Sequence, residues 1–519
     1  MSLSKKIALG TIANWSGRLI SIVFGLLLIP VLFRKLDAEE VGVWMLLGQS
    51  WAILGILDLG LTATLTRRIA LAKGKAGANI DESLGEGAPR QEVANLVKTG
   101  RVLFRYIAIG SFLVSTLFGI FLIKSIDLNT LQLSKVVVAW LVLCASYSLG
   151  LWGSVWSCML LGLGFVGWNS VISTIIGAVT VLIQLIVVFS GGGIVGLAVC
   201  AAIGSLLQRF VLIIFARSRV SEILETRANW DSLAVKSMVS PALLAWLTGI
   251  GYAVTMHTDQ LFIGSLGSTM DIPPYRAAYL IMMNLTLLSI AIAISASVFV
   301  SQLWQAGEMD RLRHVVNQSL RISLIIMVCG GACLLALGPT FFDLWLGPGN
   351  FVGYPILFVF VITLTLDVQS STFSTFSRAT EDEVFLFCSL AAAFIKVSLA
   401  LLLGFYYGLL GIALSTLIAQ LATSSWYMAY RSIKRLGLSF RGYLRDVATP
   451  ILILFIITGS VVIAIKILLK AHPPWVSVAS GVTCSGLIMM LALWFLTFDE
   501  NQKTIIMAKI RKLQSRPKV

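Results

Sequence analysis

The apolar residues of this 519-residue chain fall into repeated blocks of about 20, the length of α-helix that crosses a bilayer core of ~30 Å. Hydrophobic residues make up 58% of the chain and charged residues only 12%, against about 25% in ordinary soluble domains. With a mean hydropathy of +0.92, such a chain cannot cover its apolar surface in water. The composition excludes a soluble enzyme, a nucleic-acid-binding module and a secreted scaffold, and it predicts an all-α polytopic membrane protein.

Fourteen spans are predicted, and an even number places both termini on the same side of the membrane. With both termini in the cytoplasm, the inner segments hold 27 Lys and Arg residues and the outer segments hold 7, as the positive-inside rule requires. These loops account for the net charge of +15, so no nucleic-acid partner is expected. The predicted spans are residues 11–33, 41–63, 102–123, 136–157, 169–190, 194–216, 237–260, 276–300, 317–339, 353–373, 384–404, 408–430, 447–469 and 476–498.

The loops between the spans are too short to hold a soluble catalytic domain, because even the longest covers only residues 64–101. The sequence has no phosphate-binding loop or nucleotide motif. Its seven cysteines all lie in apolar stretches, where we expect them to pack as small residues. We therefore expect no enzyme activity and no cofactor. The energy for any transport must then come from an ion gradient, the membrane potential or the flow of substrate.

An internal repeat divides the predicted helices into two similar halves. The segment Gly193–Ala198 (GIVGLA) opens the sixth span, and Gly408–Ala413 (GLLGIA) opens the twelfth span 215 residues later. Two like-oriented six-helix bundles suit transport by alternating access, and duplication for packing alone is the alternative. The predicted organisation is an N-terminal six-helix lobe (1–216), a cytoplasmic linker (217–236), a C-terminal six-helix lobe (237–432), an additional helix pair (433–498) and a basic cytoplasmic tail (499–519).

Several stretches of the sequence resemble a known family of transporters. Leu28–Leu47 (LIPVLFRKLDAEEVGVWMLL), followed by Leu57–Leu61 (LDLGL) and Thr66–Ala70 (TRRIA), is similar to the N-terminal pattern of polysaccharide flippases. Gln302–Arg313, after the eighth span, is similar to another pattern of the same proteins. The chain thus resembles the multidrug/oligosaccharidyl-lipid/polysaccharide (MOP) exporter superfamily, and within it the Wzx-type O-antigen flippases.

The resemblance implies a two-lobed flippase that moves a polyprenyl-pyrophosphate-linked oligosaccharide from the cytoplasmic to the outer leaflet of a bacterial inner membrane. It implies a role in the biosynthesis of O-antigen, capsule or exopolysaccharide. The implied partners are the lipid-linked oligosaccharide, membrane lipid, a polysaccharide polymerase and glycosyltransferases. Fourteen spans differ from the twelve of many O-antigen flippases and resemble the lipid II flippases, in which the extra pair helps to form a groove for the lipid tail.

Basic residues inside spans are candidates for substrate binding, because a buried charge costs about 2.5–3.5 kcal/mol on insertion scales and Arg pairs well with phosphate. The resemblance implies that Arg18 contacts the pyrophosphate, and a salt bridge with Asp58 is the alternative. Lys396 lies near the middle of the eleventh span with no acid at matching depth on the neighbouring predicted spans, so we expect it to face water or a ligand. Arg276, at the outer end of the eighth span, and Arg209, in the sixth, complete the set, with anchoring at the membrane interface as their alternative role.

Four titratable residues within or beside spans are candidates for ion coupling. His257 and Asp259, near the outer end of the seventh span, form a pair that can take up protons near neutral pH, and Asp259 can hold Na⁺. A helix cap at the end of this span is the alternative. Asp58 and Asp367, near the inner ends of the second and tenth spans, are the further candidates.

Two other functions stay open at this point. A cation-coupled drug exporter of the same superfamily needs an acidic or aromatic cavity, whereas basic residues outnumber acidic ones within the spans. A membrane-bound glycan polymerase or ligase needs carboxylates, Arg or His on a large outer loop, and the outer loops are short. Trp152 and Trp156, one turn apart in the fourth span, are able to stack on sugars, although helix packing is the simpler explanation.

Overall fold

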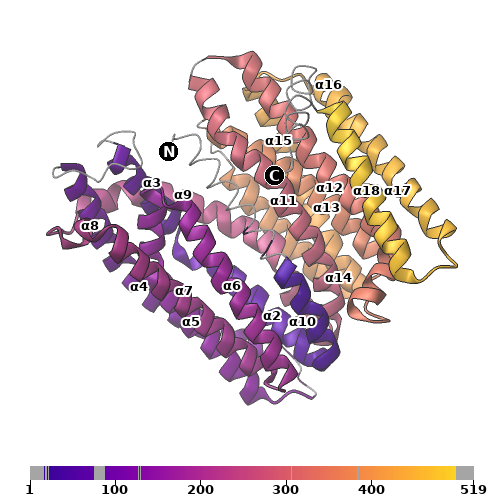
Figure 1. Ribbon diagram of the computed structural model, residues 1–519, viewed down its shortest axis with the longest axis horizontal. Coiled ribbons are helices and arrows are strands. Elements are labelled where there is room, and N and C mark those ends of the chain that lie inside the picture. Colours follow the sequence, from indigo (N-terminus) through magenta and orange to yellow (C-terminus); the bar gives the residue numbers. More distant parts are fainter. Residues whose placement is uncertain are drawn as a thin grey trace, which may run out of the picture. The chain divides into compact units, whose positions relative to one another are not determined.

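The computed structural model of the chain describes residues 17, 20, 23–74, 88–124, 126, 128, 130–305, 307–380, 382 and 385–497. Over these residues the chain is helical and contains no strand. It divides into two compact units, Met1–Pro273 and Pro274–Val519, whose helices are labelled in Figure 1. This division follows contacts, whereas the lobe boundary expected at 217–236 follows the repeat, and that boundary stays a prediction. The expected basic tail, 499–519, lies outside the described residues.

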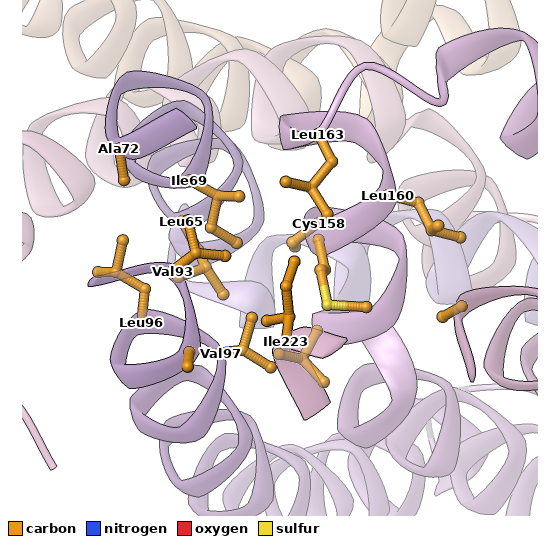
Figure 2. Packing of buried hydrophobic residues seen from close by; sticks show 14 of the residues in the cluster. Leu65, Ile69, Ala72, Val93, Leu96, Val97, Cys158, Leu160, Leu163 and Ile223 are labelled. Carbon is orange, nitrogen blue, oxygen red and sulfur yellow. The ribbon is translucent and has the colours of Figure 1, made fainter. Parts of the chain in front are cut away.

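The N-terminal unit is a bundle of long helices with two short interruptions. Its elements are α2 (Ala38–Leu54), η1 (Gly55–Asp58), α3 (Leu61–Gly74), α4 (Ala88–Lys124), α5 (Leu133–Gly162), α6 (Val166–Phe189), α7 (Gly193–Arg219), α8 (Ser221–Glu225), α9 (Ser232–His257), α10 (Asp259–Leu266) and η2 (Thr269–Asp271). Helix α5 is central, since it packs against α3, α4 and α7. Figure 2 shows a buried apolar cluster that joins α3, α4, α5 and α8, with Leu65, Val97, Cys158 and Ile223 among its members.

The C-terminal unit is built around one long helix. Its elements are α11 (Ile272–Gln305), α12 (Met309–Leu346), α13 (Tyr354–Ala379), α14 (Leu386–Ala422), α15 (Ser424–Arg435), α16 (Phe440–Tyr443), η3 (Leu444–Ala448), α17 (Thr449–Leu468) and α18 (Pro474–Leu496). Helix α12 packs against α13, α17 and α18, so the last helix pair is attached to the centre of this unit. Ser485 on α18 donates to the carbonyl of Cys329 at 3.1 Å, and Lys466 on α17 donates to that of Ala336 at 3.2 Å.

Ten helices of the described residues are long and apolar enough to cross a membrane. One of them, Leu386–Arg435, is 50 residues long and contains a kink at Gly408, so it covers two of the predicted spans. The predicted spans 41–63 and 237–260 correspond to helices that are broken, and the span 11–33 is described only in part. These observations establish an all-α polytopic membrane protein with about fourteen membrane helices.

The internal repeat is visible in the backbone as well as in the sequence. Gly193 and Gly408, which open its two copies, have φ values of +55° and +56°, a region that strains any residue with a side chain. In each copy, a Cβ on the next glycine would overlap the end of the preceding helical segment. The Cβ would meet the Val187 side chain at Gly196 and the Leu403 carbonyl oxygen at Gly411. Both copies therefore use glycine for the same tight turn between consecutive helices.

Two adjacent glutamates hold one end of the N-terminal unit. The buried Glu39 carboxylate accepts hydrogen bonds from the Thr130 hydroxyl and from the backbone N–H groups of Thr130 and Leu131, at 2.7 and 3.0 Å. Glu40 accepts the N–H of Ile194 at 3.0 Å, in the first turn of α7, where the helix dipole favours a negative charge. These contacts give a physical role to the acidic pair within the Leu28–Leu47 segment.

Replacing Glu39 by Ala tests this role. The substitution removes a charged acceptor that takes part in three hydrogen bonds, and we expect the free energy of unfolding to fall by about 2–3 kcal/mol. Thermal unfolding of the purified protein measures the change. Glu225→Ala is the control, because Glu225 is exposed at the end of α8 and its removal is expected to change stability by less than about 0.5 kcal/mol. Equal effects of the two substitutions would contradict the capping role of Glu39.

An ion pair between a buried aspartate and a half-buried arginine fixes the connection between α13, α14 and α15. Arg431 on α15 donates two hydrogen bonds to the Asp382 carboxylate, at 2.7 and 2.8 Å. Arg435, one turn further on, donates to the hydroxyl of Thr380 at 3.3 Å and also to its carbonyl oxygen. The hydrogen bonds from Arg431 hold the pKa of the Asp382 carboxyl below its ordinary value.

This pair predicts a pH-dependent contribution to stability. Because the pKa of Asp382 is lowered on folding, its contribution is present above the ordinary Asp pKa of about 3.9 and is lost as the pH falls through the lower folded value. Asp382→Asn should therefore cost about 2 kcal/mol at pH 7 and less at pH 3, below the ordinary pKa of the carboxyl. Unfolding measured at both pH values tests this. Glu308→Gln, in an exposed pair with Arg311, is the control and is expected to have little effect at either pH.

Candidate functional site

The structure places seven of the eight site residues expected from the sequence, while Arg18 lies outside the described residues. Asp58, Arg209, His257 and Asp259 belong to the N-terminal unit. The remaining three, Arg276, Asp367 and Lys396, belong to the C-terminal unit. No group of three or more His, Cys, Asp or Glu side chains among the described residues is arranged to hold a metal ion.

Asp58 lies at a break in the second predicted span. The expected continuous helix over 41–63 is wrong, because Leu59 and Gly60 take φ values of 54° and 69° between η1 and α3. The Asp58 carboxylate accepts the N–H of Gly60 at 2.7 Å and so satisfies a backbone group that the break sets free. Discontinuous membrane helices of this kind commonly form the binding sites of transporters.

The break brings Asp58 into one cluster with Arg209. Both charges act electrostatically on Tyr147 and Cys158 of α5, so all four side chains lie near one another. The aliphatic part of Arg209 passes over Gly153, where a Cβ would lie 3.3 Å from its Cγ and Cδ atoms. Arg209 is therefore held against α5 by packing, and its position joins two residues that the sequence placed in separate spans.

Tyr147 and Cys158 carry no signal in the sequence, since both lie in a continuous apolar run. Cys158 also donates to the carbonyl of Thr62 at 3.5 Å, which connects α5 to the first turn of α3 beyond the break. All seven cysteines are free thiols, so the cluster contains no disulfide.

His257 and Asp259 lie on either side of a second helix break. Helix α9 ends at His257 and α10 begins at Asp259, so the predicted span 237–260 is not continuous. Asp259 is buried in the first turn of α10, where the helix dipole stabilises its charge. Gln49 of α2 donates to the His257 carbonyl at 3.1 Å and satisfies a backbone acceptor at the end of α9. The two titratable side chains thus share one interruption of the helix.

Lys396 on α14 is a fully buried basic residue of the C-terminal unit, with 0% of its surface exposed. Asp367, 3% exposed, lies on the adjacent helix α13. Helix α13 continues to Ala379, six residues beyond the predicted end of its span. Asp367 therefore lies twelve residues before the end of α13. Lys396 lies ten residues after Leu386, where α14 begins. At 1.5 Å per residue their depths differ by about 3 Å. The expectation that no acid lies at matching depth is therefore wrong, because α13 extends to Ala379, beyond its apolar run.

The helix face around Asp367 is polar although it is buried. Thr363, Ser370 and Ser374 lie on the same side of α13 at helical spacing and are each 9% exposed or less. The small residues Ala392, Ala393 and Ala400 of α14 flank Lys396 on its buried side. The interior of the C-terminal unit therefore contains charged and hydroxyl groups at mid-span, which is an expensive arrangement in a membrane and a mark of function.

Arg276 lies in the first turns of α11, after Pro273 and Pro274. Its guanidinium stacks over the ring of Tyr279, with 5.7 Å between Cζ and the ring centre. This cation–π contact fixes a half-buried arginine at the N-terminal end of the helix. Both expected roles, contact with substrate and anchoring at the interface, are compatible with the position.

The comparisons with known proteins find counterparts of the fold. No family model and no curated protein matches the sequence. Lipid II flippase MurJ in an inward-closed conformation matches with a TM-score of 0.67 and 15% identity, over 93% of this chain and 98% of that one. An inward-facing multidrug resistance MATE family transporter of the MOP superfamily matches with a TM-score of 0.66 and 13% identity, over 82% and 99%. A MOP superfamily transporter from Pyrococcus furiosus matches with a TM-score of 0.58 and 14% identity, over 84% and 97%.

These likenesses concern the fold. The chain is a multi-pass membrane protein that is folded as the transporters of the MOP superfamily are, which agrees with the superfamily that its sequence motifs resemble. The breaks at Asp58 and Thr258 and the buried charges of α13 and α14 therefore belong to a fold that this chain shares with those proteins.

Two substitutions at Asp58 separate its structural role from its charge. Asp58→Asn keeps an oxygen that accepts the Gly60 N–H, so its free energy of unfolding should stay within about 0.5 kcal/mol of the wild type. Asp58→Ala removes the acceptor and should cost about 1 kcal/mol or more. Thermal unfolding of both variants measures the difference. If Asn proves as destabilising as Ala, the charge and not the hydrogen bond stabilises the break.

Proposed function

We propose that this chain is a flippase that moves a polyprenyl-pyrophosphate-linked oligosaccharide from the cytoplasmic to the outer leaflet of a bacterial inner membrane by alternating access. The observation that carries the proposal is the extent of the fold match. Residues 1–432, without the last helix pair, are 432 of 519 residues, or 83%. The MATE matches cover 82–84% of the chain, whereas the match to the lipid II flippase covers 93% and must include part of that pair.

Buried basic side chains support an anionic substrate. Lys396 is enclosed in the C-terminal unit, and Arg209 is held in the N-terminal unit beside Asp58. A pyrophosphate brings about two negative charges, and Arg and Lys bind phosphate oxygens through charge-assisted hydrogen bonds. The head group would occupy a wet, cationic cavity while the polyprenyl chain stays in lipid. Neutralisation of the cavity cations by substrate would then lower the cost of closing the inner side.

Four acidic or titratable groups are assigned to ion coupling in this proposal. Asp58 and the pair His257 and Asp259 lie at helix breaks, where a small rearrangement changes the local backbone. Asp367 lies at nearly the depth of Lys396, so a cation or proton bound there would change the charge that Lys396 experiences. The product would feed O-antigen, capsule or exopolysaccharide biosynthesis, with glycosyltransferases before the flippase and a polymerase after it.

The second candidate is a Na⁺- or H⁺-coupled multidrug exporter. The observation in its favour is that two acids inside helices, Asp259 and Asp367, are 7% and 3% exposed, because carboxylates suit cationic drugs. Arg18, Arg209 and Lys396 oppose such a cargo by like-charge repulsion.

Reconstitution in liposomes distinguishes the two. With a fluorescent short-chain polyprenyl-pyrophosphoryl oligosaccharide, wild type should exchange the lipid between leaflets and leave a cationic dye in place. Lys396→Ala and Arg209→Ala each remove a charged hydrogen-bond donor to the pyrophosphate, and such a hydrogen bond contributes about 1.5–3 kcal/mol. The rate of lipid exchange should therefore fall about tenfold or more in each variant.

Arg105→Ala is the matched control, since Arg105 is exposed on α4, and its activity should stay within about twofold of wild type. Full exchange by the double variant of Arg209 and Lys396 would refute the cationic cavity. Dye movement driven by an ion gradient without lipid exchange would establish the drug exporter instead.

A further inference from the structure

Two arginines and a tryptophan meet at one end of the N-terminal unit, outside the cluster around Arg209. The guanidinium of Arg101 on α4 lies over the indole ring of Trp156 on α5, with 4.4 Å between Cζ and the ring centre. Arg217 at the end of α7 is close enough for its charge to repel that of Arg101. Both arginines are exposed, whereas Trp156 is half-buried.

Packing holds the two like charges together. Val97 and Phe104, one turn before and after Arg101, belong to the buried cluster of Figure 2. Ala216, the residue before Arg217, belongs to the same cluster. The arginine backbones therefore cannot separate without opening this core, and their mutual repulsion is built into the fold.

Neighbouring basic side chains pair with oxygen acceptors of the protein, but these two guanidinium groups do not. Arg90 lies 3.8 Å from the Glu222 carboxylate, and Lys98 donates to the Ala228 carbonyl at 2.7 Å. Within the part of the chain that the structure describes, Arg101 and Arg217 form no ion pair or hydrogen bond. Two adjacent, unneutralised guanidinium groups are an arrangement that an anion completes.

The three residues lie at the depth of lipid phosphate groups. Arg101 directly precedes the predicted third span, Arg217 directly follows the sixth, and Trp156 is the last residue but one of the fourth. In the predicted topology all three positions are at the cytoplasmic interface, where Trp is enriched and where basic pockets between helices bind anionic head groups.

Apolar faces run from both arginines into the membrane. On α4, the exposed Ile109 and Phe112 follow Arg101 by eight and eleven residues and continue its side of the helix. On α7, the exposed Ile214 and Phe210 continue the face of Arg217. Two such faces beside one cationic head site match a lipid with two acyl chains better than a single polyprenyl chain.

We propose that Arg101, Arg217 and Trp156 form a binding site for the phosphate of an anionic phospholipid in the cytoplasmic leaflet. Each guanidinium donates to phosphate oxygens, the indole supports the plane of Arg101, and the acyl chains lie along α4 and α7. The site is separate from the transport residues proposed above, so lipid bound there would be a resident of the protein and not its cargo. Because the recognised chemistry is a phosphate ester, a polyprenyl pyrophosphate and free phosphate are the competing sources.

Lipid binding to the purified full-length protein tests the proposal without any transport measurement. The probe is phosphatidylglycerol, titrated in detergent and followed by native mass spectrometry, with phosphatidylcholine as the zwitterionic comparison. We expect phosphatidylglycerol to bind more tightly, and Arg101→Gln and Arg217→Gln each to weaken it about tenfold. Arg219→Gln is the matched control, because Arg219 is exposed at the same end of α7 over Phe215, and its binding should stay within about twofold.

Competition identifies the source of the phosphate. Phosphatidylglycerol that resists millimolar inorganic phosphate and a polyprenyl pyrophosphate supports the phospholipid site, while displacement by either one overturns it in favour of that ligand. Unchanged binding in Arg217→Gln overturns the site altogether, and this variant is expected to fold because its side chain is exposed at a helix end. Arg101→Lys keeps the charge and loses the planar fork, so intermediate binding is expected from it even where Arg101→Gln is unstable.

Discussion

Lipid offers no hydrogen bonds, so every backbone group freed at the end or at a break of a membrane helix must find its partner within the protein. The chain meets this constraint with side chains that come from other helices or from the break itself. Glu40 accepts from the first turn of α7, and Asp58 accepts within the turn that interrupts the second span. Arg321 of α12 donates to the last carbonyl of α18, Leu496, at 2.8 Å. Charged residues are therefore used first to make an irregular helical bundle stable in a membrane.

The same constraint concentrates function at a few positions. A helix can be interrupted only where polar groups are supplied, and these groups then remain close to the interruption. Asp58, His257 and Asp259 all lie at such points, and Arg209 is brought to the first of them by its packing over Gly153. A charge that is held by one set of contacts can be released only when another partner replaces them. In the proposed flippase, the pyrophosphate and a coupling cation are those partners.

Hydropathy was sufficient to predict the helical class and the approximate number of spans, because both depend on apolar length, and glycine motifs indicated two of the tight turns between helices. Gly193 and Gly408 illustrate this, since both need a positive φ that the sequence pattern signals. The breaks at Leu59 and Thr258 were not predicted, because hydropathy reports the environment of a segment and not the continuity of its backbone. Asp367 also lies deeper than its position in the predicted span indicates, because α13 continues past its apolar run to Ala379 and hydropathy does not detect this extension.

Contacts between distant segments were the other part that the sequence could not supply. Tyr147 and Cys158 resemble any other residues of an apolar span, and only the packing of α5 against α3 and α7 places them beside Asp58 and Arg209. Arg101 and Arg217 are likewise more than 100 residues apart, and the buried cluster of Figure 2 makes them neighbours. Residue type identified candidates, but the fold decided which of them act together.

The central claim is that the transported lipid is recognised by its pyrophosphate in a cationic interior. The most direct measurement compares leaflet exchange, in liposomes that contain the wild-type chain, of one oligosaccharide carried on polyprenyl pyrophosphate and on an uncharged polyprenyl lipid. Recognition of the pyrophosphate predicts rapid exchange of the pyrophosphate-linked lipid and little exchange of the neutral one. Equal exchange of the two lipids, or exchange of neither, would contradict it.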